Sequence, residues 1–177
     1  GMAHAGADAR ARSLSRPQVG RMRAMSTLDC RIAHLYVHPV KSCGAMAVNE
    51  APVIDTGLEW DREWMVVDAA SGRFVSQREL PRMALVQPAM RTGELVLRAP
   101  GMLALHLSLE AVESRTRARV WHDEHDAWDM GALAAQWFSD FLGRPLRLVR
   151  VDPDDLPVCN PQWTGADRAV TAFADSY

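Results

Sequence analysis

A lysine and a serine follow an apolar segment and a proline in the stretch VHPVKSCGAM, residues 37–46. Tight hairpin turns favour Asn-Gly or Asp-Gly, so Lys41 and Ser42 are unusual at such a corner. Their ammonium and hydroxyl groups donate hydrogen bonds, and Gly44 lets the backbone approach a ligand closely. The corner is therefore a candidate site for an anion. An exposed turn without a ligand is the alternative, because a Lys-Ser pair alone is a weak signal.

Arg62 is the second candidate residue and lies in GLEWDREW, residues 57–64. Its guanidinium group matches the geometry of two phosphate oxygens at once. The alternative is an ordinary ion pair with a neighbouring carboxylate, which contributes about 0–1 kcal/mol at a protein surface. If the strands that end at Lys41 and begin at Arg62 lie side by side, Lys41, Ser42 and Arg62 converge on one point.

Length and composition are those of one globular domain. The chain has 177 residues, of which 48% are hydrophobic, and a net charge of −2. This balance excludes an overall basic field for nucleic acid or an anionic membrane. Cys30, Cys43 and Cys159 are odd in number and lack C-x-x-C spacing, which argues against a disulfide framework and a structural zinc site. These cysteines suit a reducing compartment, so we expect a cytoplasmic protein. No apolar run approaches the ~20 residues of a membrane span.

The elements that must position these residues are mostly strands. From Arg31 onward, apolar and polar residues alternate in short segments between turn residues. The segment 103–109 is the clearest case, because its four leucines at alternate positions share one face. The sequence predicts a mainly β fold, an antiparallel β-barrel-like domain. The expected strands are residues 31–38, 45–54, 62–68, 73–77, 83–90, 94–100, 103–109, 115–121, 127–130 and 145–151.

One amphipathic α-helix is expected to pack against this barrel, within residues 129–143. Asp129 is a candidate N-cap, Gly143 a candidate residue just past the helix end, and Pro145 prevents continuation. Residues 152–165 are predicted to form a loop. The apolar face of the helix is expected to comprise Leu133, Trp137, Phe138, Phe141 and Leu142.

Two further clusters invite functional interpretations. His122 to Asp126, in WHDEHDAW, would suggest a metal site in isolation. We expect these residues to form a hairpin turn instead, in which consecutive side chains point in different directions. Arg115, Arg117 and Arg119 share a strand face with Trp121, as in a nucleic-acid platform. A solvated strand face is the interpretation that the net acidic composition favours.

Several motifs occur together in an order that resembles one family. They are PVKSC, GLEWDREWMVVD, QRELPRMAL, the segment WFSDFLG and the closing RLVR. Together they resemble the N-terminal β-barrel domain that precedes MOSC domains, the molybdenum-cofactor-binding modules of cofactor sulfurases and amidoxime-reducing enzymes. The resemblance covers roughly residues 31–177. It implies a barrel domain at residues 28–165 and a truncated entry to a MOSC domain at 166–177. Residues 1–27 are expected to form a disordered arm, because they are rich in arginine and show neither strand nor helix periodicity.

The resemblance also implies roles for particular residues. In that family the lysine, the serine and the arginine contact the phosphate-bearing end of molybdopterin, which corresponds here to Lys41, Ser42 and Arg62. Arg78 is a further candidate, because a basic residue in a strand-end loop can line the same cleft; an ion pair with Glu79 or Asp68 is the alternative.

The family's molybdenum-ligating cysteine lies in the MOSC domain, beyond the part that this chain resembles. Cys43 is therefore not assigned that role, and we expect it to be a buried, small apolar group. We expect no catalytic residue and no metal ligand in this chain. The molybdenum cofactor belongs to the complete protein, and we expect none to be bound by this chain alone.

The function that follows is that of the cofactor-phosphate-binding N-terminal domain of a MOSC-type molybdenum oxidoreductase, inactive by itself. The alternative is a standalone module that binds a phosphorylated small molecule or docks to a partner chain carrying the MOSC domain. A MOSC-domain chain or a redox protein is the expected partner, and neither nucleic acid nor a membrane is expected. Because the partner domain is missing, we expect the segment VTAFADSY, residues 170–177, to pack poorly.

Overall fold

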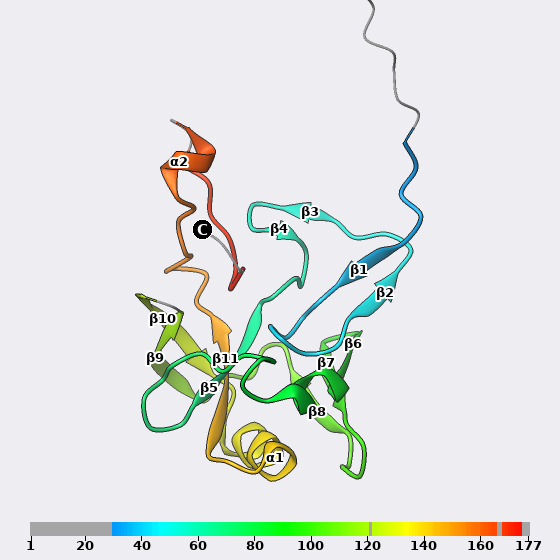
Figure 1. Ribbon diagram of the computed structural model, residues 1–177, viewed down its shortest axis with the longest axis vertical. Coiled ribbons are helices and arrows are strands. Elements are labelled where there is room, and N and C mark those ends of the chain that lie inside the picture. Colours follow the sequence, from blue (N-terminus) through cyan, green and yellow to red (C-terminus); the bar gives the residue numbers. More distant parts are fainter. Residues whose placement is uncertain (1–29, 121, 166–167, 175–177) are drawn as a thin grey trace, which may run out of the picture. The chain divides into compact units, whose positions relative to one another are not determined.

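The computed structural model describes residues 30–120, 122–165 and 168–174 (Figure 1). Within these ranges, the helices and strands belong to one compact unit, Ile32–Tyr177. The predicted disordered arm, residues 1–27, lies outside the described residues.

The central element is an antiparallel sheet of four strands in the order β5-β11-β10-β9. Its alternating residues are mostly apolar on both faces of β5 and β11, which predicts burial on both sides. Strands β9 and β10 differ from the prediction. They were expected to be joined by the five-residue segment HDEHD, residues 122–126, but their connection is shorter. The strands are β5 (Trp64–Asp68), β9 (Ser114–Val120), β10 (Asp123–Asp129) and β11 (Leu146–Val151).

The β9–β10 hairpin corrects the expected turn. Asp123 pairs directly with Val120, so the hairpin closes between these two residues and most of the acidic and histidine cluster lies within β10. Consecutive residues of a strand point to opposite faces of the sheet. The side chains of the cluster are therefore divided between two faces of the sheet.

Smaller antiparallel sheets complete the β-structure. One sheet has three strands in the order β6-β7-β8. The strands of two smaller sheets, β1-β2 and β3-β4, precede them in the chain. Their bounds are β1 (Leu35–Val37), β2 (Met46–Val48), β3 (Val53–Ile54), β4 (Gly57–Leu58), β6 (Gln87–Arg91), β7 (Glu94–Arg98) and β8 (Leu105–Ser108).

The fold is mainly β with antiparallel sheets and one amphipathic helix, as predicted, but no closed barrel occurs among the described residues. The sheets are several and small. The predicted strand at 73–77 is reduced to single bridges, in which Phe74 pairs with Val67 of β5 and Arg73 with Arg119 of β9. This segment thus connects the two edges of the four-stranded sheet through isolated hydrogen bonds rather than a ladder.

The helix α1 (Ala132–Leu142) lies close to β11 and β8 (Figure 1). Gly143 ends it in the left-handed conformation, as predicted. Two details were wrong: the N-cap residue is Gly131 rather than Asp129, and Leu133 is 69% exposed. Ala134 takes the buried place on that face. Asp129 still contributes at this end, because its Oδ1 accepts a hydrogen bond from the Gly131 N–H at 2.8 Å.

Two further segments differ from the prediction. Residues 83–90 were expected to form one strand, but a 3₁₀ helix η1 (Pro81–Leu85) precedes β6. The predicted loop at 152–165 contains a short helix α2 (Pro161–Thr164), which begins after Asn160. The Asn160 side chain accepts a hydrogen bond from the Gln162 N–H, the usual role of Asn at an N-cap.

The alternation along β5 and β11 divides the interior into two cores. Trp64 and Val66 of β5 point into the first core, which also contains the buried face of α1 and the inner residues of β7 and β8. Met65 and Val67 point into the second core, with inner residues of β9 and β10. Because side chains alternate across a strand, one pair of strands serves both cores.

The C-terminal segment is docked into the second core rather than loosely packed. Thr171, Ala172 and Phe173 are buried, and Phe173 is a member of that core. Backbone hydrogen bonds join the Thr171 N–H to the Pro157 carbonyl at 2.9 Å and the Phe173 N–H to the Arg62 carbonyl at 3.1 Å. The expectation of poor packing was therefore wrong for residues 171–173.

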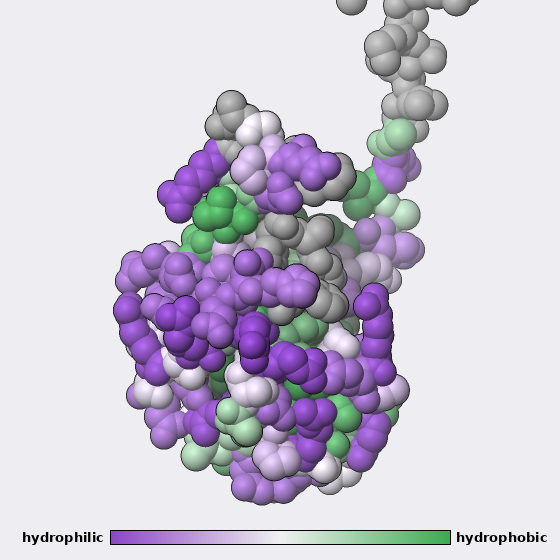
Figure 2. Space-filling model, turned by 60° about the vertical axis from the view of Figure 1, so that its left-hand side comes forward, coloured by the Kyte–Doolittle hydropathy of each residue, from purple (hydrophilic) through white to green (hydrophobic). Residues whose placement is uncertain are grey.

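The surface is largely polar where β9 and β10 come forward, and Figure 2 shows mostly hydrophilic side chains on that face. Arg115, Arg117 and Arg119 are all exposed there. Arg115 pairs with Asp152 and Arg117 with Glu124, which agrees with a solvated face. Within the described ranges, no helix has the length and apolar character that crossing a bilayer requires.

Candidate functional site

The Lys41–Ser42 corner is held by backbone pairing to the start of β5. Val40 forms a parallel bridge with Trp64, and the Lys41 N–H donates to the Trp64 carbonyl at 2.8 Å. Ser42 takes a left-handed conformation, with φ 65°, which turns the chain sharply. The two segments predicted to lie side by side therefore do so.

Gly44 has a packing role in this corner. Its N–H donates to the Val86 carbonyl at 2.8 Å. A Cβ at Gly44 would lie 2.7 Å from the Val86 oxygen and 2.6 Å from Nε2 of Gln87. The close approach that only glycine permits is thus to Val86, just before β6, and to Gln87, the first residue of β6.

Arg62 lies in a strained turn before β5. Its φ is 55° and that of Trp60 is 66°, both left-handed values that non-glycine residues adopt rarely. Hydrogen bonds hold the turn in place: the Arg62 N–H donates to the His38 carbonyl at 2.7 Å, and the His38 N–H donates to Oδ1 of Asp61 at 2.8 Å. The Arg62 guanidinium also pairs with the Asp61 carboxylate.

Ser42, Arg62 and Arg78 line one pocket, which we call the polar pocket. Its volume is about 430 Å³. Three segments supply it: the Lys41–Ser42 corner, the turn at Arg62, and the loop that follows the bridges at residues 73–74. The Gln77 amide donates to the Ser42 carbonyl at 3.4 Å and joins two of these segments. The full lining is His38, Ser42, Cys43, Arg62, Phe74, Ser76, Gln77 and Arg78.

Arg78 is exposed, and the carboxylates considered as its partners are paired elsewhere. Glu79 pairs with Arg73 at 2.8 Å, and Asp68 pairs with Arg144 at 2.8 Å. The Arg144 hydrogen bond holds the pKa of Asp68 well below its usual range, and Arg73 lowers the pKa of Glu79 in the same way. Arg78 forms no ion pair with any residue in the described ranges.

Lys41 does not line this pocket. Its side chain is 1% exposed, and Nζ donates to the Phe173 carbonyl at 2.8 Å and to the Ala174 carbonyl at 2.5 Å. Nζ also lies 5.0 Å from the centre of the Phe74 ring, a favourable cation–π position. Because Phe74 lines the polar pocket, the ammonium lies behind the pocket wall. The sequence contains 19 arginines and this single lysine.

Cys43 is buried, as predicted, with 3% of its surface exposed. Burial raises the pKa of its thiol far above the ordinary value, so the group stays protonated. No group of three or more potential metal-ligating side chains occurs among the residues that the structure describes.

Some residues of the polar pocket were not singled out from the sequence. His38 lies in the stretch VHPVKSCGAM with Ser42, Gln77 begins the motif that contains Arg78, and Phe74 precedes Arg78 by four residues. Their closeness in the sequence to Ser42 and Arg78 could have indicated them. A second and larger pocket, whose walls include Trp60 and Trp128, was not anticipated at all, since its residues come from widely separated segments.

Comparison with known proteins agrees with the motifs. A family model described as the MOSC N-terminal beta barrel domain matches residues 29–145. The molybdenum cofactor sulfurase of Homo sapiens is 38% identical over 124 residues, which is 67% of this chain and 14% of the human protein. That of Danio rerio is 37% identical over 135 residues, 72% of this chain and 16% of the fish protein. The chain thus spans about one-seventh to one-sixth of the length of these relatives.

A solved structure is also similar in sequence. The solution structure of a Bordetella bronchiseptica protein has 32% identity to this chain and a TM-score of 0.49, covering 66% of this chain and 98% of that protein. The family model matches well over half of the 177 residues. The chain therefore belongs to the family of MOSC N-terminal β-barrel domains.

Proposed function

We propose that this chain binds the phosphate-bearing end of the molybdenum cofactor, molybdopterin, as the N-terminal domain of a MOSC-type protein. The observation that most supports the proposal is the meeting of Ser42, Arg62 and Arg78 in one pocket, although Ser42 and Arg78 are 36 positions apart in the sequence. The relatives are molybdenum cofactor sulfurases, which makes this cofactor the first candidate for the anion.

The donors in the polar pocket fit a phosphate group. Two guanidinium groups supply fixed positive charge in a forked geometry, and the Ser42 hydroxyl adds a neutral donor. Arg62 pairs with Asp61, but a guanidinium has five N–H donors and can serve a carboxylate and a phosphate together. Its side chain is 33% exposed and accessible to a ligand.

Lys41 has a positioning role in this proposal. Its ammonium holds the carbonyls of Phe173 and Ala174 and lies against the Phe74 ring, so it supports the pocket from behind. Direct contact between Lys41 and phosphate, which the resemblance implies, stays a prediction. It requires the ammonium to leave these carbonyls when a ligand binds.

The rest of the reaction would use residues outside this chain. When bound, the cofactor supplies molybdenum for oxygen or sulfur transfer, and residues here contribute binding and orientation of its phosphate end. We expect the chain alone to lack oxidoreductase activity and to need a MOSC domain, in the same protein or a partner chain, together with a redox partner.

Calorimetry with two ligands tests the proposal. Inorganic phosphate should bind the unmodified protein weakly, and molybdopterin released anaerobically from a molybdoenzyme should bind more tightly. Because a hydrogen bond to a charged group is worth about 1.5–3 kcal/mol, Arg62→Gln should weaken both by roughly ten- to a hundredfold. Arg98→Gln is the matched control, since Arg98 is exposed on β7 and lines neither pocket.

The outcomes separate the alternatives. If molybdopterin binds no more tightly than phosphate and Arg62→Gln weakens both, the chain is a general phosphate module and the cofactor proposal is wrong. If Arg62→Gln and Arg98→Gln have equal effects, the polar pocket is not the anion site. Selective ¹⁵N labelling of the single lysine adds a third readout, because direct contact would shift its one ammonium signal when phosphate is added.

A further inference from the structure

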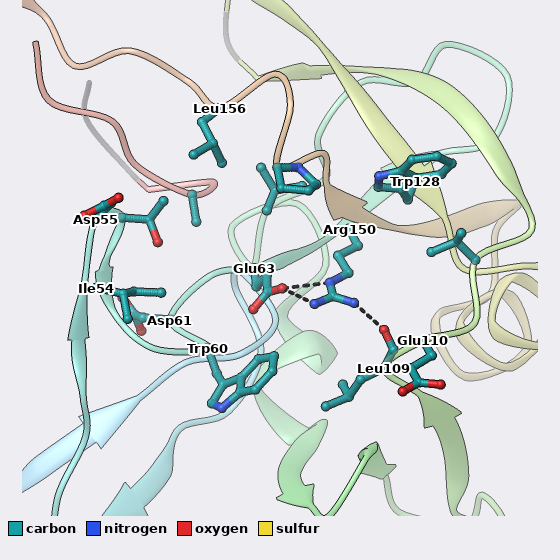
Figure 3. Close-up of a pocket in the computed structure, with 15 residues that line it drawn as sticks. Ile54, Asp55, Trp60, Asp61, Glu63, Leu109, Glu110, Trp128, Arg150 and Leu156 are labelled. Atoms are coloured by element: carbon teal, nitrogen blue, oxygen red, sulfur yellow. Dashed lines mark hydrogen bonds and ion pairs between the residues drawn. The ribbon is translucent and has the colours of Figure 1, made fainter.

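The larger pocket, which we call the tryptophan pocket, has a volume of about 480 Å³ (Figure 3). This volume falls within the roughly 300–1,000 Å³ of small-molecule sites. Apolar side chains from β3, the loop after β8 and the segment after β11 form much of its wall. Trp60 and Trp128 contribute the two aromatic surfaces.

The aromatic surfaces are held rigidly. Trp60 stacks on the fully buried Trp64, with ring centres 6.1 Å apart and an angle of 20° between the planes. The left-handed backbone at Trp60 is an unfavourable conformation, and such residues cluster at functional sites. Trp128 already forms one cation–π contact, because the Arg115 guanidinium lies 4.8 Å from its ring centre. Both rings therefore offer fixed π surfaces of the kind that attract cations.

The one arginine in the pocket is neutralised by its neighbours. Arg150 donates from Nε to Glu63 at 2.7 Å and from Nη1 to the Leu109 carbonyl at 2.5 Å, as Figure 3 shows. Its guanidinium also lies 5.1 Å from the Trp64 ring. These contacts fix Arg150 as part of the pocket's structure and leave its charge matched by that of Glu63.

The remaining charges of the pocket are negative. Its lining contains four carboxylates, those of Asp55, Asp61, Glu63 and Glu110, against the single guanidinium of Arg150. Asp61 is paired with Arg62, and Glu63 with Arg150. Asp55 and Glu110 form no ion pair with other residues in the described ranges. A ligand with positive charge would therefore be favoured at this rim, and an anion would be repelled.

We propose that the tryptophan pocket binds a small organic cation with an apolar body, such as an aryl- or alkylammonium compound. The apolar body would lie against the tryptophan rings and the apolar wall of the pocket, and the ammonium group would face Glu110, since Figure 3 shows Asp55 on the opposite side of the pocket. Apolar contact, cation–π attraction and charge complementarity then act on one ligand. This site is separate from the polar pocket, and the proposal does not rest on cofactor binding.

NMR with matched probes tests the proposal. Benzylammonium, benzyl alcohol and benzoate have nearly the same shape and differ in charge. Benzylammonium should shift the indole N–H signals of Trp60 and Trp128 in a saturable way, whereas benzyl alcohol should bind about three- to tenfold more weakly and benzoate not detectably. Glu110→Gln should weaken benzylammonium binding by about threefold or more.

The control variant is Glu50→Gln, because Glu50 is exposed and does not line the pocket. It should leave benzylammonium binding unchanged. Equal binding of benzylammonium and benzyl alcohol would show an apolar pocket without charge selection and overturn the proposal. So would equal effects of the two substitutions, or the absence of saturable shifts at both tryptophans. Arg78→Gln should not alter benzylammonium binding, which keeps this test independent of the polar pocket.

Discussion

The polar pocket and the tryptophan pocket have opposite charge, yet residues of one short turn line both. Trp60 and Asp61 line the tryptophan pocket, and the next residue, Arg62, lines the polar pocket. The left-handed backbone at Trp60 and Arg62 accompanies this change of direction. Left-handed conformations cost roughly 1–2 kcal/mol per residue, and the hydrogen bonds to His38 offset that cost. A strained turn can thus present opposite charges on its two sides.

Lys41 offers the strongest way to disturb both pockets together. It contacts Phe74 of the polar pocket and holds the segment whose Ala172 lines the tryptophan pocket. Lys41→Met removes the donor from two carbonyls and should lower the free energy of unfolding by roughly 2–4 kcal/mol. Urea denaturation measures the change.

Lys41→Arg is the matched control for charge. A guanidinium keeps the charge but not the compact shape, so we expect an intermediate loss. Amine-directed acetylation gives an independent check, because the chain has one lysine and its α-amino group as targets. If Lys41 is acetylated as fast in the folded protein as in urea, its side chain is not buried in solution.

The buried thiol of Cys43, in the wall of the polar pocket, should affect the stability of the protein in alkaline solution. Burial raises the folded-state pKa of this thiol, so only the unfolded chain ionises it as the pH rises past the ordinary thiol pKa of about 8.5. A raised folded-state pKa contributes stability that is lost with increasing pH, by up to about 1.4 kcal/mol per pH unit. Cys43→Ala should therefore flatten the loss of stability between about pH 9 and 11. An unchanged slope in chemical denaturation would contradict this.

Asp61→Asn should move the two pockets in opposite directions. The amide keeps an oxygen that can accept the His38 N–H, but the negative charge beside Arg62 is lost. Phosphate affinity in the polar pocket should rise about threefold to tenfold, and benzylammonium affinity in the tryptophan pocket should fall about twofold to threefold. A change in the same direction for both ligands would mean that the turn does not give the two pockets opposite electrostatic potentials.

The smallest expected effect is that of Asp68 on phosphate binding near Arg78. Since Asp68 pairs with Arg144 and not with Arg78, Asp68→Asn should change phosphate affinity by less than about twofold. The lowered pKa of Asp68 means that its contribution to stability is present above the ordinary carboxyl pKa and is lost as the pH falls toward the folded value. The variant should therefore lose slightly less stability on acidification. A clear gain in phosphate affinity would instead indicate that Asp68 restrains Arg78.

Local patterns in the sequence predicted the elements whose causes are local. The helix at Ala132–Leu142 and its end at Gly143 follow from a helical apolar period and a left-handed glycine. The β9–β10 turn was misplaced because the sequence between Val120 and Asp123 contains none of the usual turn residues, while the acidic run after it resembles a turn. Leu133 was misplaced because periodicity alone does not set the edge of a buried face.

The site was predictable only in part, for reasons of distance along the chain. Motifs indicated Ser42, Arg62 and Arg78, which the structure brings to one pocket. The burial of Lys41 depends on carbonyls 132 and 133 positions away, which no local pattern encodes. The tryptophan pocket likewise combines residues from 54 to 172 and requires the tertiary fold to be known.

The docking of Phe173 has a consequence for how the protein is made. This residue completes a core whose members Met65 and Val67 leave the ribosome long before it. During synthesis, the second core therefore lacks one of its largest side chains until Phe173 is added. Lys41 likewise lacks two of its carbonyl partners until residues 173 and 174 are added. Contacts between such distant parts of a chain form slowly, so the nascent domain exposes apolar surface to chaperones until residues 171–173 emerge.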